Sequence, residues 1–180
     1  MSTTLFTVGH GPTDRHQLGT RLTGAGVQQV VDVRRFPGSR NSPDVGKDLL
    51  AQWLPELGIG YRWEQRLGGR RSLPKDAAVL DPWWRVAAFA AYSAYTRTPE
   101  FAAALDELLT AAAERRVSIM CSESVWWRCH RRVISDVAVL QREVDVQHLM
   151  PDGRLAPHPV AEGARLDLSG QLYWDGLDAV

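Results

Sequence analysis

The chain has 180 residues, 44% of them hydrophobic and 23% charged, and its 21 basic residues balance 21 acidic ones, so the formal net charge is zero. This composition predicts one globular domain and excludes a disulfide-stapled miniprotein, because only two cysteines are present. Zero net charge also excludes a globally basic protein that is steered to anionic partners. No apolar run approaches the ~20 residues of a membrane helix, and the N-terminus lacks a signal-peptide pattern, so we expect a cytoplasmic protein without a membrane partner.

Predicted strands and helices alternate along the first 150 residues. Short apolar runs predict strands over residues 5–8, 29–33, 60–63, 117–121 and 144–148. Apolar spacing and capping residues predict helices over residues 14–24, 45–57, 83–95, 98–112 and 128–140. This order predicts an α/β fold: a single three-layer domain with a mostly parallel sheet of about five strands and helices on both faces. The domain is expected to span residues 1–150, and residues 151–180 to form a C-terminal tail that is packed on the domain or extended.

Unusual residues gather where the predicted strands end. Only two of the 21 basic residues are lysines, and nine of the 19 arginines lie in three strand-exit loops. Because ligands of such sheets bind beyond the carboxyl ends of the strands, we expect a common anion-binding cleft there. Its predicted substrate-binding residues are His10, Arg34, Arg40, Gly68, Gly69, Arg70, Arg128 and Arg131. Plainer interpretations are that surface loops tolerate arginine and that the glycines only form turns.

Cys121 is the candidate nucleophile or redox thiol of this cleft. It ends a predicted strand just before a predicted helix, where the helix N-terminus and nearby arginines can lower a thiol pKa from ~8.5 by several units. Glu123 or His130 is the candidate proton-transfer partner, and Asp32 a further catalytic candidate whose alternative role is to pair with Arg34. Cys129 is expected on the apolar face of the helix over residues 128–140, as a small buried hydrophobe.

The loop from Cys121 to Arg128 resembles the Cys-loop-Arg cradles of cysteine phosphatases and rhodaneses. It is one residue too long for the phosphatase spacing and contains no glycine. Two alternatives use both cysteines: a metal site of Cys121, Cys129 and His130, and a transient disulfide. The spacing is not that of a structural zinc site, so no metal or other cofactor belongs to the leading hypothesis.

Four segments carry a family resemblance: VGHG (8–11), VDVRRFPGSR (31–40), LGGRR (67–71) and CSESVWWRCHRRVI (121–134). With them, residues from about 4 to 150 resemble the domain of unknown function 488 family. The resemblance implies a compact α/β domain and a candidate site of His10, Asp32, Arg34, Arg40, Cys121, Glu123, Cys129, His130 and Arg131. Gly11 stands where the family usually has serine or threonine.

Three functional hypotheses follow from these residues. The first is a Cys-dependent enzyme that acts on an anionic, phosphate-bearing substrate, either a nucleotide or nucleic acid, in the strand-end cleft. The second is a non-catalytic nucleotide or nucleic-acid binder, in which Trp126 or Trp127 stacks on a base. The third is a metal-binding protein that uses cysteine and histidine. The sequence names no oligomeric state.

Overall fold

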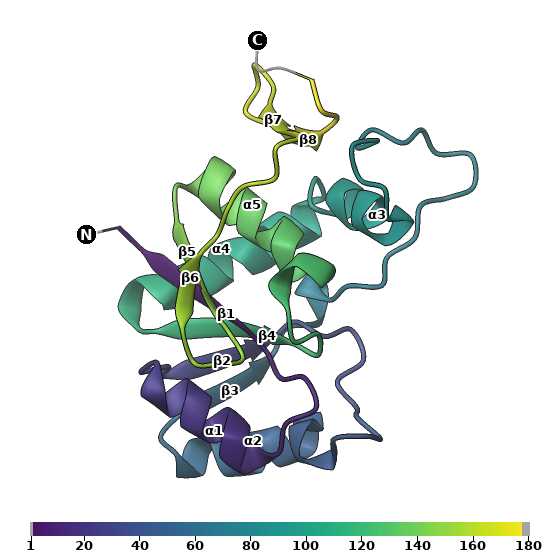
Figure 1. Ribbon diagram of the computed structural model, residues 1–180. Helices are drawn as coiled ribbons and strands as arrows, with labels where there is room; N and C mark the ends of the chain where they lie inside the picture. The colour runs from purple at the N-terminus through teal and green to yellow at the C-terminus, as the bar shows by residue number, and fades with distance from the viewer. Residues whose placement is uncertain (1, 178–180) are drawn as a thin grey trace.

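A computed structural model describes residues 2–177 of the chain. Its main sheet has six strands in the order β3-β2-β4-β1-β5-β6, and only β6 runs antiparallel to its neighbour. Helices cover both faces of this sheet (Figure 1). The predicted single α/β domain with a mostly parallel, helix-covered sheet is therefore confirmed, with one strand more than expected.

The elements follow one another in the predicted order. The strands are β1 (Thr4–Gly9), β2 (Gln29–Asp32), β3 (Gly60–Trp63), β4 (Val117–Cys121), β5 (Asp145–Leu149), β6 (Leu155–Pro157), β7 (Ala164–Leu166) and β8 (Leu172–Trp174). The helices are α1 (Arg15–Gly24), α2 (Lys47–Glu56), α3 (Ala87–Tyr95), α4 (Pro99–Glu114) and α5 (Arg131–Arg142), with short 3-10 turns at Pro43–Val45, Gln65–Leu67 and Trp126–Arg128.

Alternate residues of the strands build two cores. In β4, for example, Ile119 packs in the core under α4 and α5, and Met120 packs in the core under α1 and α2. This follows from the period of two along a strand, which sends consecutive side chains to opposite faces. Because both faces are buried, the strands read as continuous apolar runs rather than as alternating ones.

The sheet opens a crevice at the end of β4. This strand lies between β2 and β1, which are followed by α2 and α1 on one face of the sheet, whereas β4 is followed by α5 on the other. The chain therefore leaves neighbouring strands toward opposite faces, and in parallel sheets this arrangement leaves room for a ligand beyond the strand ends. Cys121 is the last residue of β4 and so lies at this point.

Two helices begin later than the sequence indicates. The helix predicted from residue 83 begins at Ala87, because the buried Asp81 pairs with Arg97 and accepts a hydrogen bond from the backbone N–H of Trp174, which ties this turn to β8. The helix predicted from residue 128 begins at Arg131, after a 3-10 turn and an extended residue, Cys129. Cys129 is thus not on the apolar face of a helix but directly before its N-terminus.

The last described residues add three short strands. β6 pairs with β5 at the edge of the main sheet, and β7 and β8 form a hairpin of their own. Trp174 of β8 is fully buried and packs against Trp84 at 6.2 Å between ring centroids. Figure 1 shows this hairpin above α5, next to the long segment that leads into α3.

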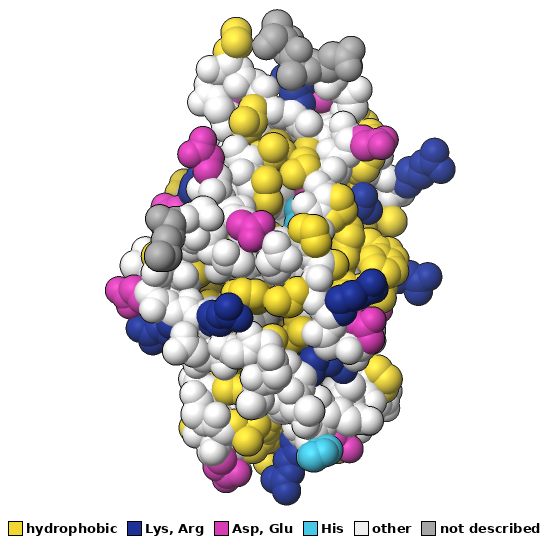
Figure 2. Space-filling model, turned by 60° about the vertical axis from the view of Figure 1, so that its left-hand side comes forward, with side chains coloured by type: hydrophobic (Ala, Val, Ile, Leu, Met, Phe, Trp, Pro, Cys, Tyr) yellow, Lys and Arg dark blue, Asp and Glu magenta, His cyan; other side chains and the backbone are white. Residues whose placement is uncertain are grey.

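Acidic and basic side chains are interspersed over the face of the molecule drawn in Figure 2, in keeping with the zero net charge. Among residues 2–177, no helix combines the length and the apolar character needed to cross a membrane.

Candidate functional site

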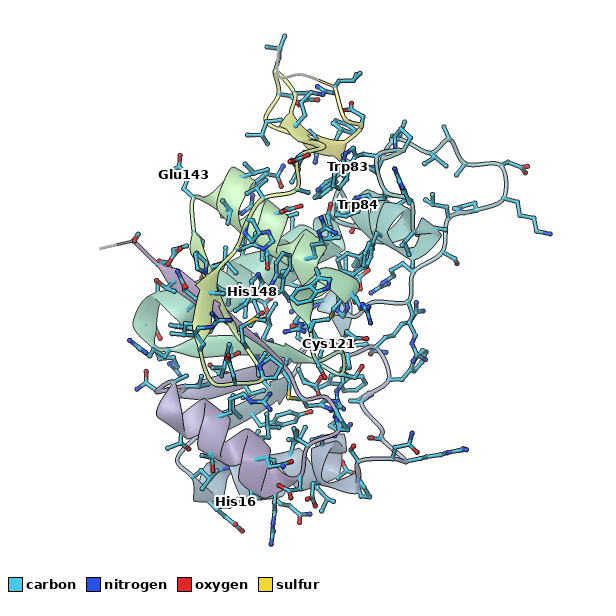
Figure 3. The ribbon with its side chains drawn as sticks, in the orientation of Figure 1. His16, Trp83, Trp84, Cys121, Glu143 and His148 are labelled. Atoms are coloured by element: carbon cyan, nitrogen blue, oxygen red, sulfur yellow. The ribbon has the colours of Figure 1, made fainter. Side chains whose placement is uncertain are left out.

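A cavity of about 480 Å³ lies at the carboxyl ends of the central strands. Figure 3 shows Cys121 at the end of β4, on the side toward which the parallel strands run. The lining residues come from every strand-exit loop of the central strands and from α3: His10, Arg34, Arg35, Phe36, Gly38, Ser39, Arg40, Asn41, Gly69, Arg70, Ala88, Phe89, Tyr92, Cys121, Ser122, Glu123, Arg128, Cys129 and His130.

The wall of this cavity contains two thiols and an imidazole, here called the thiol cluster: Cys121, Cys129 and His130. The two Sγ atoms and a ring nitrogen of His130, which are possible metal ligands, all lie within 4.8 Å of one another. Nδ1 of His130 is 3.6 Å from Sγ of Cys129 and 3.8 Å from Sγ of Cys121. Nε2 of His130 lies 2.8 Å from the carbonyl oxygen of Val33, so it carries the proton that this oxygen accepts. Nδ1 is therefore left with a free lone pair that faces both sulfurs.

The negative charge of the thiol cluster is favoured on Cys129. Burial acts to raise the pKa of this thiol, but the hydrogen bond from Cys121 and the charge of Arg131 outweigh it and lower the pKa to about 6. Sγ of Cys129 accepts from the backbone N–H of Arg131 at 3.5 Å and from its side-chain Nε at 3.4 Å. The first of these donors belongs to the first residue of α5, so the helix N-terminus acts on Cys129 and not, as predicted, on Cys121.

The pKa of the Cys121 thiol shifts in the opposite direction. Its hydrogen bond with Cys129, together with burial, raises its pKa to about 12. A neutral thiol at Cys121 can donate to the Cys129 thiolate, whereas two adjacent buried thiolates would repel each other. The opposite pKa shifts of the two thiols thus favour a single negative charge on the pair, with Cys129 as its holder.

Glycines allow this compact arrangement. A Cβ atom on Gly9 would lie 1.7 Å from the carbonyl oxygen of Glu123, so only glycine lets β1 approach the loop after β4. A Cβ atom on Gly69 would lie 2.9 Å from Nδ1 of His130, so this backbone lies directly against the imidazole. Both positions fall within the segments VGHG and LGGRR.

Asp32 and Arg34 form a buried pair under the cavity. Nε and one terminal nitrogen of Arg34 donate to the two carboxylate oxygens of Asp32 at 2.9 and 2.7 Å, and the hydroxyl of Tyr61 donates to the same carboxylate. The second terminal nitrogen of Arg34 lies 3.3 Å from Nε2 of His10, and burial lowers the pKa of His10, so this imidazole is neutral at pH 7. Asp32 is fully buried and does not line the cavity. Its contacts position Arg34 and, through it, His10.

Four arginines line the cavity without a carboxylate partner within the described residues: Arg35, Arg40, Arg70 and Arg128. By contrast, the arginines paired on the remaining surface include Arg62, Arg66, Arg97, Arg142 and Arg165. Arg70 also adopts a left-handed backbone conformation with φ of 56°, which is uncommon outside glycine. Unpaired guanidinium groups that converge on one cavity suit a phosphate or carboxylate.

Arg131 joins the thiol cluster to a second buried group, the histidine cluster of His148, His158 and Asp136. A terminal nitrogen of Arg131 donates to Oγ1 of Thr7 at 3.3 Å, and this hydroxyl lies 2.6 Å from Nδ1 of His148. Nε2 of His148 is 2.9 Å from Nδ1 of His158, whose Nε2 is 2.7 Å from Oδ1 of Asp136. Each group can thus donate to the next, from a cation at one end to a carboxylate at the other.

The predicted site residues divide into two groups. The cavity brings together His10, Arg34, Arg40, Gly69, Arg70, Cys121, Glu123, Arg128 and His130. It leaves out Asp32, Gly68 and Arg131: Gly68 packs on the backbone of Arg35, and Arg131 is 1% exposed, too deep to reach a ligand directly. Sequence reasoning missed that Cys129 lines the cavity as the thiol held by Arg131, although the adjacent His130 and Arg131 were the signal. It also missed Arg35, whose side chain faces the cavity while that of Arg34 is buried.

Comparisons with known proteins give one match. A family model described as "Domain of unknown function DUF488" matches residues 15–138, about two thirds of the chain. The searches of curated proteins and of solved structures find no match.

Proposed function

The chain belongs to the DUF488 family, a domain of unknown function, and from the geometry of its cavity we propose that it is a thiol-dependent enzyme acting on a phosphate-bearing substrate. One observation carries this proposal: two thiols and the His130 imidazole lie together in the wall of a cavity whose lining includes four arginines without a carboxylate partner among residues 2–177, and the pKa of one of these thiols, Cys129, is lowered. Lowered thiol pKa values and unpaired cations in one cavity are features of reactive sites rather than of a packed core.

In this proposal the thiol cluster supplies the nucleophile. Cys129 carries the thiolate, and Cys121 donates a hydrogen bond to it and borders the cavity. The electron pair of the sulfur forms a bond to the electrophilic atom of the substrate as the bond to the leaving group breaks. The Nδ1 lone pair of His130 faces both sulfurs and can accept a thiol proton, and Glu123 lines the same cavity, so these two side chains are the candidates for proton transfer.

The arginines would bind the phosphate. Arg40, Arg70 and Arg128 are exposed, and each guanidinium can present two parallel donors to phosphate oxygens. Arg131 acts through Cys129, and Asp32 acts through Arg34, so both are positioning residues in this proposal.

Alkylation of the thiols as a function of pH tests the proposal. The chain has only two cysteines, so Cys121→Ser and Cys129→Ser each leave a single thiol to follow by mass spectrometry with iodoacetamide. We expect the wild-type rate to titrate near pH 6, this titration to vanish in Cys129→Ser, and inorganic phosphate to slow the reaction. A single titration at the ordinary thiol value of about 8.5–9, without any protection by phosphate, would overturn the proposal.

A second candidate function is binding of Zn²⁺ by the same three side chains. Two sulfurs and the free Nδ1 lone pair of His130 converge within 4.8 Å, and the Val33 carbonyl fixes the imidazole as an outer partner does for metal ligands. Three protein ligands with an open fourth position are typical of a catalytic zinc site. Metal analysis of the purified protein separates the candidates: one tightly held zinc per chain, lost in Cys121→Ser and in Cys129→Ser alike, favours the metal site.

The non-catalytic alternative makes a different prediction. A pure binder of phosphate-bearing ligands would keep full affinity in the double variant Cys121→Ser/Cys129→Ser and would lose affinity as salt rises. It would also show no chemical change of any bound substrate, which product analysis by mass spectrometry can establish.

A further inference from the structure

A second hollow of about 650 Å³ adjoins the strand-end cavity. Ala88, Phe89 and Arg128 line both, so the two are neighbours separated by these residues. The rest of its wall is aromatic and basic, with Trp83, Trp84, Trp127 and Arg132 among the lining residues. Figure 3 shows Trp83 and Trp84 beside α3 and below the C-terminal hairpin.

Of the two adjacent tryptophans, Trp126 packs against a buried histidine, whereas the ring of Trp127 is partly exposed. The ring of Trp126 stacks on His148 at 4.5 Å with an angle of 5° between the planes. Trp127 is 43% exposed and lines the second hollow. Its ring is therefore accessible to a ligand in the hollow. The sequence left open which tryptophan faces the cleft, and Trp127 is the one available to stack.

The wall of the hollow also holds donors without acceptors. Within the described residues, Nε1 of Trp84 and Nε of Arg132 are buried and have no hydrogen-bond partner. Arg85, Arg128 and Arg132 have no carboxylate partner there either. Of these groups, the exposed cations Arg85 and Arg128 can reach a ligand, and cations next to aromatic faces suit a flat ligand that is rich in hydrogen-bond acceptors.

The hollow is held in shape by the C-terminal hairpin. A Cβ atom on Gly163 would lie 2.1 Å from the Trp83 ring, so this ring packs directly on the backbone that leads into β7. The backbone N–H of Trp83 donates to the carbonyl oxygen of Trp174 in β8. The aromatic wall is therefore formed before any ligand binds, which lowers the ordering cost of stacking.

We infer that this hollow binds the base of a nucleotide whose phosphate lies among the arginines of the strand-end cavity. The inference rests on the proposed phosphate site and names the substrate class, a nucleotide unit that is either free or part of a single strand. Trp127 supplies the stacking face, and Arg128 stands between base and phosphate. The exposed guanidinium groups of Arg85 and Arg128 can donate to acceptor atoms of the base. Stacking of one base on an aromatic side chain is worth roughly ten- to hundredfold in affinity.

Calorimetric titration with paired probes tests this assignment. Adenosine 5′-monophosphate carries base and phosphate, ribose 5-phosphate carries only the phosphate, and a single-stranded hexanucleotide carries both in a chain. We expect Trp127→Ala to weaken the mononucleotide roughly ten- to hundredfold and to change ribose 5-phosphate by less than about twofold. Trp127→Phe should restore most of the loss, and Val79→Ala, an exposed apolar position outside the hollow, should change nothing.

The outcomes separate this inference from the proposed function. Equal loss for both small probes, or no loss for either, overturns the base site. A selective loss for the mononucleotide in a protein whose thiols titrate ordinarily would retain the base site and reject the thiol enzyme. If the hexanucleotide binds more tightly and with a steeper salt dependence than the mononucleotide, the ligand is a strand; if not, it is a free nucleotide. Circular dichroism confirms that each variant is folded.

Discussion

The thiol cluster and the histidine cluster both contact Arg131 or its hydrogen-bonded partner Thr7, but only the thiol cluster borders the cavity. In the histidine cluster every ring nitrogen has a protein partner, and the chain of hydrogen bonds ends on the buried carboxylate of Asp136. The thiol cluster contains no carboxylate, and its charge is held by Arg131 and a helix N-terminus. The histidine cluster is buried and fully hydrogen-bonded, so it stabilises the fold. The thiol cluster borders the cavity and keeps the Nδ1 lone pair of His130 unused, so it is available for chemistry.

Removing the carboxylate of the histidine cluster should have the largest effect on stability. Asp136 accepts from His158, from the backbone N–H of Ala161 and from Nε1 of Trp174. Asp136→Ala leaves these buried donors unpaired, so we expect the free energy of unfolding to fall by about 3–5 kcal/mol in urea denaturation.

The matched control is Asp106→Ala, which removes a 63% exposed carboxylate that pairs with Arg142 at the surface. It should cost less than about 1 kcal/mol. If the two variants are equally stable, the histidine cluster does not stabilise the fold.

The pH dependence of stability should separate the two clusters. The lowered pKa of Cys129 contributes stability that is present above pH 9, the ordinary value, and is lost as pH falls to about 6. The raised pKa of Cys121 contributes stability that is present below pH 9 and is lost as pH rises to about 12. Burial lowers the pKa of His148 to about 2, so its contribution is lost only below its ordinary value of 6.5.

Denaturation from pH 4 to pH 11 measures these windows. Relative to Cys121→Ser/Cys129→Ser, the wild-type protein should gain stability between pH 6 and 9, with a slope of up to about 1.4 kcal/mol per pH unit, and should lose it again above pH 9. Below pH 6 both proteins should lose stability in parallel, because His148 is common to both. A flat difference from pH 6 to 9 would mean that the cysteines carry no shared charge.

The general architecture of this chain was accessible from the sequence, because its signals are local. Asp14 caps α1 and Thr98 caps α4 as predicted, and all five parallel strands lie within a residue or so of the apolar runs. The start of α3 was not accessible, since it depends on Asp81 reaching β8 more than 90 residues along the chain.

The location of the site was predictable from the sequence, but the separate roles of Cys121, Cys129 and Arg131 were not. Strand exits located Cys121 and His130 at one edge, because parallel strands end together. Which of Cys121 and Cys129 has the lowered pKa depends on where α5 begins, and a three-residue 3-10 turn followed by the extended Cys129 decides that. The burial of Arg131 depends on contacts with Thr7 and Glu123, which are remote in sequence or made through the backbone.

Replacing the guanidinium group of Arg131 by an ammonium group should mainly change the pKa of the thiol cluster. Arg131 donates at once to Sγ of Cys129, Oγ1 of Thr7 and the carbonyl oxygen of Glu123. Arg131→Lys keeps the charge but cannot reproduce three divergent donors, so the pKa of Cys129 should rise toward its ordinary value. We expect alkylation at pH 7 to slow by about tenfold, which corresponds to a rise of the Cys129 pKa by about two units from its value of about 6. Arg142→Lys, in the last turn of α5, is the control and should leave the rate unchanged.

Cutting the link between the clusters should have the smallest effect and is the most direct test of their independence. Thr7 is fully buried, accepts from Arg131 and lies against Nδ1 of His148. Thr7→Val preserves the shape but leaves one donor and one ring nitrogen unpaired, so the free energy of unfolding should fall by about 1–2 kcal/mol. The alkylation titration near pH 6 should stay in place, because both donors of Arg131 to Cys129 remain. A shift of the titration by a full pH unit would instead show that the histidine cluster sets the charge of the thiol cluster through Thr7, and that the two form one functional unit.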